Sequence, residues 1–438
     1  MEWLVQRMNF NKFNPPEQIV SILRRIYASE MTNLSGGNIS VSDGLGHMWI
    51  TPAGVDKGNL TAEDIVLVNP QGVTEGKHKP SSEYPFHHAI YKKRPDLKAI
   101  VHAHPPGLIA YSIAGKVPEL RVNPVAYQMC HPVGYAPYAM TGSEELGKNI
   151  ALTFAGGFNI TMLENHGVVC GGEDLLQAYQ RLESLELCAR TLINAKSIGD
   201  YKVLTESQLE RFSRIKPALN HCFLENNPEF DTQEQREIVK IVQRGCDRQL
   251  LFSSGSVVSV RIDRNSFLIT PSSFDLCDMQ LEDTVLIQGD KFVEGKVPSR
   301  NVNFHRDIYS FHPEINSVIT SQPPHAMAFA ITGIPFVSYT IPECYVMLHD
   351  VPTIPYDVFY SQPKELAKQI SKNTPVVIIA NDCVVTTGSS LLQAFDRLEI
   401  LEYSARSLLS LPNLGALRPI DENRLREIRE KFFKDATN

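Results

Sequence analysis

Val101-His102-Ala103-His104-Pro105 is the stretch around which the chain is organised. If it is a β-strand, residues two apart point to the same face of a sheet, so His102 and His104 offer two imidazoles side by side. Two neutral imidazoles converging on one ion are a common way of holding zinc. Such a site also needs a third ligand and an open position. A pair of histidines alone is more often structural, so the rest of the chain must decide between the two interpretations.

Two further segments offer the missing parts of such a site. Glu164-Asn165-His166-Gly167 turns out of a buried-type strand and places His166 at a strand end, where functional residues are common. Ser81-Ser82-Glu83 precedes a predicted helix. There a serine can cap the helix and Glu83 can favour the positive end of its dipole. Alternatively, the helix start can bind phosphate while the carboxylate transfers protons.

Two glycine-containing turns come earlier in the chain. Ser35-Gly36-Gly37-Asn38 permits a tight turn and a close approach of the backbone to a ligand, with side-chain donors beside it. Thr51-Pro52-Ala53-Gly54 has a similar form, in which a hydroxyl, a proline and a glycine follow a short strand. Both suit an anion-binding loop, although plain turns of this composition are far commoner.

The composition bounds the classes of protein. With 438 residues the chain is long for one core, which favours two domains, and 43% hydrophobic and 21% charged residues are typical of a globular protein. A net charge of −7 and a pI near 6.0 argue against a polyanion-binding surface, so we expect no nucleic-acid partner. A local pocket for one phosphate stays compatible with this charge.

Features that the sequence lacks indicate the cellular compartment of the protein and the state of its cysteines. No apolar run reaches membrane-spanning length, and the first residues lack the features of a signal peptide, so we expect a cytoplasmic protein without a membrane partner. The eight cysteines form no CxxC motif. Their spacing therefore predicts neither a disulfide framework nor a cysteine-held zinc.

The periodicity of apolar residues predicts the main elements. Residues 15–31 and about 174–198 are predicted to be amphipathic helices, and 97–104 a strand. Residues 127–137, with two prolines and a glycine after Tyr127, are expected to be a loop. His87 and His88, in the helix after Glu83, are interpreted as packing residues.

The second half of the chain repeats the first. The sequence LLQAYQRLE at 175–183 recurs as LLQAFDRLE at 391–399, and Ile50-Thr51-Pro52 recurs as Ile269-Thr270-Pro271. A polar segment near 205–236 joins the two copies. We therefore predict two domains, 1–210 and 225–438, in which the second is a degenerate copy of the first.

The repeat is most informative where it fails. Scaffold residues survive in the second copy, whereas each candidate site residue is replaced. The replacements are His102 by Thr320, His104 by Gln322, His166 by Asp382, Glu83 by Asn301, Ser82 by Arg300 and Asn38 by Val257. Packing histidines would have no reason to change together, so this comparison favours a metal site in the first copy alone.

These residues resemble the class II aldolase/adducin family. The matching motifs occur in the family order over roughly residues 15–200: Ser35-Gly36-Gly37-Asn38, Thr51-Pro52-Ala53-Gly54, Ser81-Ser82-Glu83, His102-Ala103-His104-Pro105 and Asn165-His166-Gly167. Residues 236–412 resemble a second, degenerate copy. The resemblance implies an α/β fold of tandem, duplicated class II aldolase-like α/β/α domains, each with a central, mainly antiparallel sheet.

The resemblance also implies the parts of the site. It implies one zinc ion per chain, held by His102, His104 and His166, with Glu83 as the catalytic acid/base. Positions matching the phosphate-binding motifs of the family are Gly37, Asn38, Thr51, Gly54, Ser81 and Ser82. Family aldolases also use a mobile tyrosine, for which Tyr127 is our candidate.

The implied reaction is the cleavage of a ketose 1-phosphate, such as fuculose 1-phosphate, to dihydroxyacetone phosphate and an aldehyde. Zinc would act as a Lewis acid while Glu83 moves the proton. Family members that epimerise pentulose phosphates tend to carry aspartate at the position of Glu83, so glutamate favours an aldolase. A sugar-phosphate epimerase or dehydratase on the same metal site, and an adducin-like interaction protein without chemistry, are the alternatives.

The resemblance suggests an assembly as well. The resemblance implies rings of four subunits, as in the family aldolases, with active sites between neighbouring subunits. A closed ring of this kind repeats one heterologous contact. A chain with two family domains can build such a ring from two chains. We therefore expect a homo-oligomer, a dimer forming a pseudo-four-domain ring, in which a segment such as Glu343-Cys344-Tyr345 of the degenerate copy supports the site of the intact one.

Overall fold

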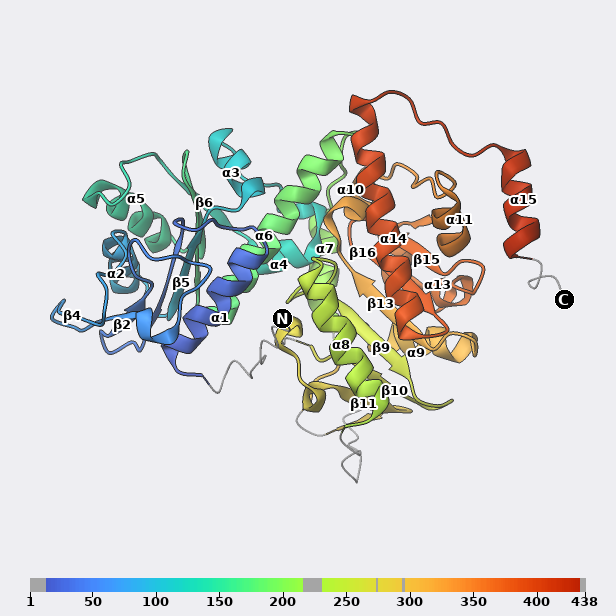
Figure 1. The fold of residues 1–438 in the computed structure, drawn as a ribbon, viewed down its shortest axis with the longest axis horizontal. Helices are drawn as coiled ribbons and strands as arrows, with labels where there is room; N and C mark the ends of the chain where they lie inside the picture. Colours follow the sequence, from blue (N-terminus) through green and yellow to red (C-terminus); the bar gives the residue numbers. More distant parts are fainter. Residues whose placement is uncertain (1–12, 216–230, 273–274, 294–295, 434–438) are drawn as a thin grey trace. The chain divides into compact units, whose positions relative to one another are not determined.

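The computed structural model describes residues 13–215, 231–272, 275–293 and 296–433, which form two compact units (Figure 1). The first unit comprises the described residues up to Leu120 together with Val125–Arg190. The second comprises Arg121–Pro124 and the described residues from Thr191 onward. The limits 1, 225 and 438 of the predicted domains lie outside the described residues, and the domain bounds 1–210 and 225–438 stay a prediction.

The first unit is built on an eight-stranded sheet of order β4-β3-β2-β1-β5-β8-β7-β6. Only β6 and β7 pair in parallel, and the other neighbours are antiparallel. The strands are β1 (Asn38–Ser42), β2 (Met48–Ile50), β3 (Val66–Val68), β4 (Thr74–Glu75), β5 (Ala99–Ala103), β6 (Val133–Ala136), β7 (Ile160–Leu163) and β8 (Gly167–Gly172).

Helices connect and cover these strands. They are α1 (Pro15–Ala28), η2 (Ala62–Asp64), α2 (Tyr84–Lys93), α3 (Pro106–Ile113), η3 (Leu120–Val122), α4 (Pro124–Cys130), α5 (Glu144–Ala155) and α6 (Leu175–Lys196). Phe86 and Ile90 of α2 pack with Ile150 and Phe154 of α5 in one apolar core, to which Ile100 of β5 also belongs. Side chains of β5 that share the face of Ile100 therefore point toward α2.

The second unit repeats the sheet with the same order, β12-β11-β10-β9-β13-β16-β15-β14. Its one parallel pair, β14 with β15, again lies at the end of the sheet. The strands are β9 (Val257–Arg261), β10 (Ser266–Ile269), β11 (Val285–Gln288), β12 (Lys291–Phe292), β13 (Ser317–Ser321), β14 (Thr353–Ile354), β15 (Val376–Ile379) and β16 (Cys383–Gly388). The predicted tandem α/β fold with mainly antiparallel sheets is thus confirmed.

The helices of the second unit follow the same plan, with additions after each copy. They are α7 (Glu206–Arg214), α8 (Gln233–Asp247), η4 (Leu276–Asp278), η5 (Leu281–Asp283), α9 (Val302–Phe311), α10 (Pro324–Thr332), α11 (Pro342–Leu348), α12 (Tyr356–Ser361), α13 (Pro363–Gln369), α14 (Leu391–Ser410), η6 (Leu411–Asn413) and α15 (Glu422–Phe432). In Figure 1, α8 and α14 run side by side in the second unit.

α7 belongs to the second unit although it directly follows the first copy. Arg211 pairs with Asp357 of α12 at 3.0 Å, and Phe212 packs edge-on against Tyr360 at 6.2 Å between ring centroids. The guanidinium of Arg300, which stands where the first copy has Ser82, lies 4.0 Å from the centre of the Phe212 ring. α7 therefore covers the part of the second copy where the site residues have been replaced.

Two sequence-based expectations differ from the structure. Residues 127–137, expected as a loop, contain the end of α4 and all of β6, because a short strand paired in parallel with β7 leaves little periodicity to recognise. Cys246 and Cys277 form a disulfide, although no framework was expected from the spacing. The end of α8 and η4 bring together two cysteines that are 31 residues apart. Within the described residues, no helix combines the length and the apolar character needed to cross a membrane.

Candidate metal centre

Strand pairing places His102 at the centre of the site. In the antiparallel pair of β1 and β5, Asn38 stands opposite His102, and on its other side His102 stands opposite Val169 of β8. His102 shares a face with Ile100 and therefore points toward α2, and its side chain is buried. The strand ends at Ala103, and His104 follows it with its N–H donating to the carbonyl oxygen of Met31 at 3.2 Å.

Two glycines make room for the histidines. Gly37 has a φ of +71°, and a Cβ added there would lie 2.6 Å from the carbonyl oxygen of His102. A Cβ added at Gly167 would lie 2.6 Å from the carbonyl oxygen of Ala103 and 2.7 Å from Cδ2 of His104. Both separations are too short for real atoms, so any side chain at either position would displace β5 or the His104 ring.

His166 reaches the site from the turn between β7 and β8. Asn165 adopts a φ of +53°, a left-handed conformation that asparagine tolerates better than most residues. The buried hydroxyl of Ser112 accepts from the N–H of His166 at 3.1 Å and donates to the carbonyl oxygen of Leu163 at 2.5 Å. The turn is thereby held from α3, which directs the His166 ring toward the other two histidines.

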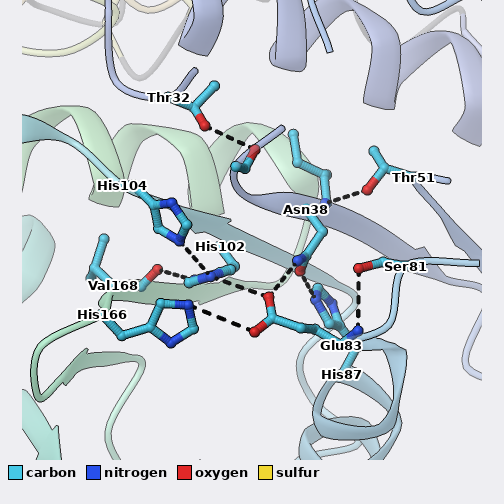
Figure 2. Close-up of polar contacts among 12 residues, drawn as sticks. Thr32, Asn38, Thr51, Ser81, Glu83, His87, His102, His104, His166 and Val168 are labelled. Carbon is cyan, nitrogen blue, oxygen red and sulfur yellow. Dashed lines mark hydrogen bonds and ion pairs between the residues drawn. The ribbon is translucent and has the colours of Figure 1, made fainter. Parts of the chain in front are cut away.

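The three imidazoles converge (Figure 2). Ring centroids are 4.8 Å apart for His102 and His104, 4.8 Å for His102 and His166, and 5.2 Å for His104 and His166. One nitrogen from each residue lies within 4.8 Å of the others, and Nε2 of His102 and Nε2 of His104 are 3.1 Å apart. Two ligands of one tetrahedral zinc ion are about 3.3 Å apart, so this spacing fits a shared metal.

The charge state of the imidazoles also suits metal binding. Burial, together with the nearby His104 and His166, holds the pKa of His102 well below its ordinary value. Burial lowers the pKa of His104 to about 4, and it lowers the pKa of His166 although Glu83 opposes this. Metal ligation requires the neutral imidazole, which is therefore the form present at neutral pH.

A hydrogen bond fixes which nitrogen of His102 faces the site. Nδ1 lies 3.0 Å from the carbonyl oxygen of Val168, which can only accept, so Nδ1 carries the proton. Nε2 then presents its lone pair toward His104 and His166, as in metal sites where the second ring nitrogen donates to a carbonyl. The three residues fit a divalent metal with three nitrogen ligands and a further open position.

Glu83 is the carboxylate beside this group. It is the N-cap residue of α2, but its side chain makes no capping hydrogen bond. Oε2 lies 3.4 Å from Nε2 of His102, and Oε1 lies 3.7 Å from Nε2 of His166. The N–H of Glu83 donates to the hydroxyl of Ser81 at 3.3 Å. A helix start thus turns its carboxylate into the site instead of using it as a cap.

The predicted phosphate-binding residues fall into two groups. Asn38 and Ser81 are buried around Glu83, while Ser82 beside them is exposed, and a Cβ at Gly54 would meet open space. Thr51 differs, because its fully buried hydroxyl accepts from the N–H of Ile39 at 3.2 Å. Thr270 makes the same bond to Val258 in the second copy at 3.1 Å, which marks it as a scaffold contact.

Tyr127 lies apart from these contacts. It is in α4, half-buried, and its ring stacks on His131 with centroids 4.5 Å apart. No hydrogen bond among the described residues joins its hydroxyl to Glu83 or to the three histidines. Its catalytic role stays a prediction.

In the second copy, other side chains occupy the positions of the three histidines. Asp382, at the position of His166, is buried, which raises the pKa of its carboxyl, and it accepts a hydrogen bond from the hydroxyl of Tyr360. Gln322 donates to the carbonyl oxygen of Asp382 at 2.8 Å. Thr320 is buried, and its hydroxyl has no partner among the described residues. This set offers no cluster of imidazoles.

Residues that the sequence interpretation missed lie behind Glu83. His87 was interpreted as a packing residue, yet its ring connects Asn38 to Ser40, and Ser40 in turn contacts Tyr91. The spacing of Glu83, His87 and Tyr91, four residues apart along one helix, was a signal that these side chains share a face. The partners on β1 could not be found without the strand pairing.

The chain belongs to the family described as Class II Aldolase and Adducin N-terminal domain, whose model matches residues 17–193 and 236–409. A 5-deoxy-D-ribulose 1-phosphate aldolase of Bacillus thuringiensis is 34% identical over 203 residues, covering 45% of this chain and 93% of that protein. An L-fuculose phosphate aldolase of Methanocaldococcus jannaschii is 37% identical over 180 residues, covering 41% of this chain and 96% of that protein.

Two further matches complete the comparison. A 3-oxo-tetronate 4-phosphate decarboxylase of Haemophilus influenzae is 34% identical over 198 residues, covering 44% of this chain and 93% of that protein. Among solved structures, an L-fuculose 1-phosphate aldolase is 31% identical, covers 44% of this chain and 92% of that chain, and superposes with a TM-score of 0.41. The relatives thus match somewhat less than half of this chain, in keeping with its two family domains.

Proposed function

We propose that the protein is a zinc-dependent aldolase that cleaves a ketose 1-phosphate to dihydroxyacetone phosphate and an aldehyde. One observation carries this proposal: three neutral imidazoles converge beside a carboxylate, in a chain of the class II aldolase family. Aldolases of fuculose phosphate and 5-deoxyribulose 1-phosphate are among its relatives, and they support this class of substrate.

In this proposal His102, His104 and His166 hold one zinc ion per chain. The ion supplies Lewis-acid stabilisation of the negative charge that develops on substrate oxygens. Glu83 takes the proton of the C4 hydroxyl as the bond between C3 and C4 breaks, and the electron pair of that bond stays on C3. Glu83 then gives a proton to C3, which becomes part of dihydroxyacetone phosphate.

The phosphate group of the substrate is assigned to the loops around Glu83. Gly37, Gly54, Ser81 and Ser82 offer backbone N–H or hydroxyl donors, and the amide of Asn38 has a second N–H beyond the one it uses. We assign Thr51 a supporting part, because its hydroxyl holds the backbone of β1.

The test is a screen of the purified protein against ketose 1-phosphates, including fuculose 1-phosphate and 5-deoxyribulose 1-phosphate. Dihydroxyacetone phosphate is detected by its NADH-dependent reduction with an added dehydrogenase. We expect turnover that a chelator abolishes and zinc restores. We expect Glu83→Gln to keep its zinc but lose roughly 10²–10⁴-fold in kcat, the range typical of proton transfer. A zinc-loaded protein that forms no dihydroxyacetone phosphate from any of these substrates would contradict the proposal.

The similarity to a 3-oxo-tetronate 4-phosphate decarboxylase supports a second candidate reaction. Loss of carbon dioxide next to a carbonyl also leaves an electron pair on carbon, so the same ion and the same Glu83 would serve it. Release of carbon dioxide from the 3-oxo acid phosphate, without cleavage of ketose 1-phosphates, would favour this reaction. Epimerised or dehydrated products would instead identify the two alternatives that share the metal site.

A further inference from the structure

A chain of buried polar groups runs from α2 through β1 back to the catalytic carboxylate. The hydroxyl of Tyr91 lies 2.8 Å from that of Ser40, which lies 2.6 Å from Nδ1 of His87. Nε2 of His87 lies 2.5 Å from Oδ1 of Asn38, and Nδ2 of Asn38 donates to Oε2 of Glu83 at 2.8 Å. The last three residues of this chain appear together in Figure 2.

The contacts allow one direction for the hydrogen bonds. Asn38 turns its NH₂ group to Glu83, so its oxygen faces His87, and Nε2 of His87 must carry a proton to donate to it. Complete burial lowers the pKa of His87 to about 3, so the ring is neutral and its other nitrogen is bare. Nδ1 therefore accepts from Ser40, and Ser40 accepts from the hydroxyl of Tyr91.

The second copy keeps the tyrosine, serine and histidine of this chain of hydrogen bonds and lacks the asparagine and the glutamate. The hydroxyl of Ser259 lies 2.7 Å from Nδ1 of His305 and 2.7 Å from the hydroxyl of Tyr309. Val257 stands in the position of Asn38, opposite Thr320 in the strand pair. Nε2 of His305 is buried and has no hydrogen-bond partner among the described residues. The serine, histidine and tyrosine thus belong to the scaffold, whereas the step through asparagine occurs only beside the metal group.

The chain of hydrogen bonds gives the two oxygens of Glu83 different environments. Oε2 is held by Asn38, while Oε1 is buried and has no hydrogen-bond partner among the described residues. A buried carboxylate oxygen without a partner is costly to keep, so its persistence marks a place for an incoming donor. Oε1 is also the oxygen on the side of His166.

We propose that His87 is a positioning residue for the proposed reaction. Its Nε2–H fixes the amide of Asn38 so that the NH₂ group holds Oε2 of Glu83 and leaves Oε1 to exchange the proton with the substrate. No proton travels along the chain, and every hydrogen atom in it stays on its own residue. The inference rests on the proposed function for what Oε1 does, and on the contacts alone for the orientation of the chain.

The test compares matched substitutions in the two copies. His87→Leu and His305→Leu each remove a buried histidine from a serine and a tyrosine, but only His87→Leu also breaks a bond to an asparagine, so we expect it to cause the larger loss of thermal stability. Only His87→Leu should lower kcat, by roughly 10–100-fold, the range found when residues supporting a metal site are removed. Zinc content, measured by elemental analysis, should stay at one per chain in both variants. Equal kcat in the two variants would overturn the proposal.

Two further variants keep the test decisive if His87→Leu folds poorly. His87→Gln retains an N–H donor that can reach Asn38, so we expect it to recover most of the lost kcat. In the Asn38→Ala background, His87→Gln and His87→Leu should have equal kcat, because the group through which His87 acts is gone. A preserved difference between them in that background would show that His87 acts by another route.

A measurement without substrate separates this inference from the proposed function. In protein labelled with ¹⁵N-histidine, we expect the NMR signal of His87 to show the proton on Nε2. A proton on Nδ1 would overturn the inference even if the protein is an active aldolase. Conversely, a proton on Nε2 in a protein that cleaves no ketose 1-phosphate would refute the proposed function and leave the orientation of the chain intact.

Discussion

At the scale of single residues, His102 offers the sharpest test of the zinc site, since its Nε2 lies within reach of both neighbouring imidazoles. We expect His102→Ala to reduce bound zinc from one per chain to a small fraction. The matched control is Thr320→Ala, which changes the equivalent residue of the second copy and should leave the zinc content unchanged. Elemental analysis after dialysis measures both. Two tightly bound zinc ions per wild-type chain would contradict the assignment.

The partnerless Nε2 of His305 leads to a prediction about stability. A buried polar atom without a partner costs about 1–3 kcal/mol, so Val257→Asn, which supplies the oxygen found in the first copy but removes an apolar core side chain, should be less destabilising than its control by about 1 kcal/mol. The control is Val258→Asn, in which the neighbouring side chain of β9 points to the opposite face. Denaturant titration of each variant gives the change. A loss of stability in Val257→Asn as large as in the control would disprove the account.

Some of these residues could be predicted from the sequence and others could not. The two-residue spacing of His102 and His104, and their joint loss with His166 in the second copy, indicate a group of histidines that the structure does bring together. The roles of Asn38 and His87 depend on how β1 pairs with β5 and how α2 lies over both. Such contacts join residues 49 apart, and no local pattern encodes them.

At the scale of elements, Glu186 of α6 caps the start of α3, which follows His104. Its oxygens accept from the N–H groups of Gly107 and Leu108 at 3.0 and 2.9 Å, and Glu402 binds the start of α10 in the same way. A contact kept in both copies serves the fold. It orients the helix whose Ser112 holds the turn of His166.

Burial raises the pKa of Glu186 to about 7, against 4.5 for a free side chain, which makes this cap sensitive to pH. The folded state keeps the proton over a range in which the unfolded state has lost it. The contribution of Glu186 is therefore fully present below pH 4.5 and falls as pH rises to about 7, by about 3 kcal/mol. We expect the free energy of unfolding of wild type to fall more steeply across this range than that of Glu186→Gln. Parallel profiles would contradict this prediction.

The elements also show where sequence patterns lose their power. The long amphipathic helix α6 was predicted from periodicity, because its 22 residues make about six turns, which repeat the apolar stripe often enough to be recognised. α4, with seven residues, and β6, with four, offer too few repeats. α7 is a different case, because its amphipathic residues are visible in sequence but the unit against which they pack is not.

At the scale of the whole molecule, the identical strand order of the two sheets makes the tandem arrangement a property of the fold as well as of the sequence. The repeated LLQA segments predicted it, and they lie at the start of α6 and α14. Arg181 of α6 donates to the carbonyl oxygen of Gly171 in β8, and Arg397 of α14 donates to that of Thr387 in β16. What sequence comparison could not supply is the assignment of α7 to the second unit, since that depends on contacts between residues almost 150 apart.

The assembly prediction belongs to this scale. If two chains form a ring of four family domains, light scattering should give a mass in solution of twice the 49.1 kDa of one chain. Because a degenerate domain would then neighbour each site, dilution that dissociates the dimer should reduce kcat while zinc stays bound. A monomer that keeps full activity at every concentration would rule this arrangement out.

The unequal oxygens of Glu83 have a stereochemical consequence. In the proposed reaction a single carboxylate, held in place by Asn38, delivers the proton, so the proton reaches the planar C3 from one side only. For the proposed cleavage run in deuterium oxide, the hydroxymethyl carbon of dihydroxyacetone phosphate should gain deuterium at a single prochiral position. In Asn38→Ala, where the carboxylate is no longer held and solvent can protonate C3 from the other side, the label should begin to spread over both positions, and product NMR distinguishes the two patterns. The position of deuterium in the product would thus report whether the Asn38 amide holds Glu83 in place.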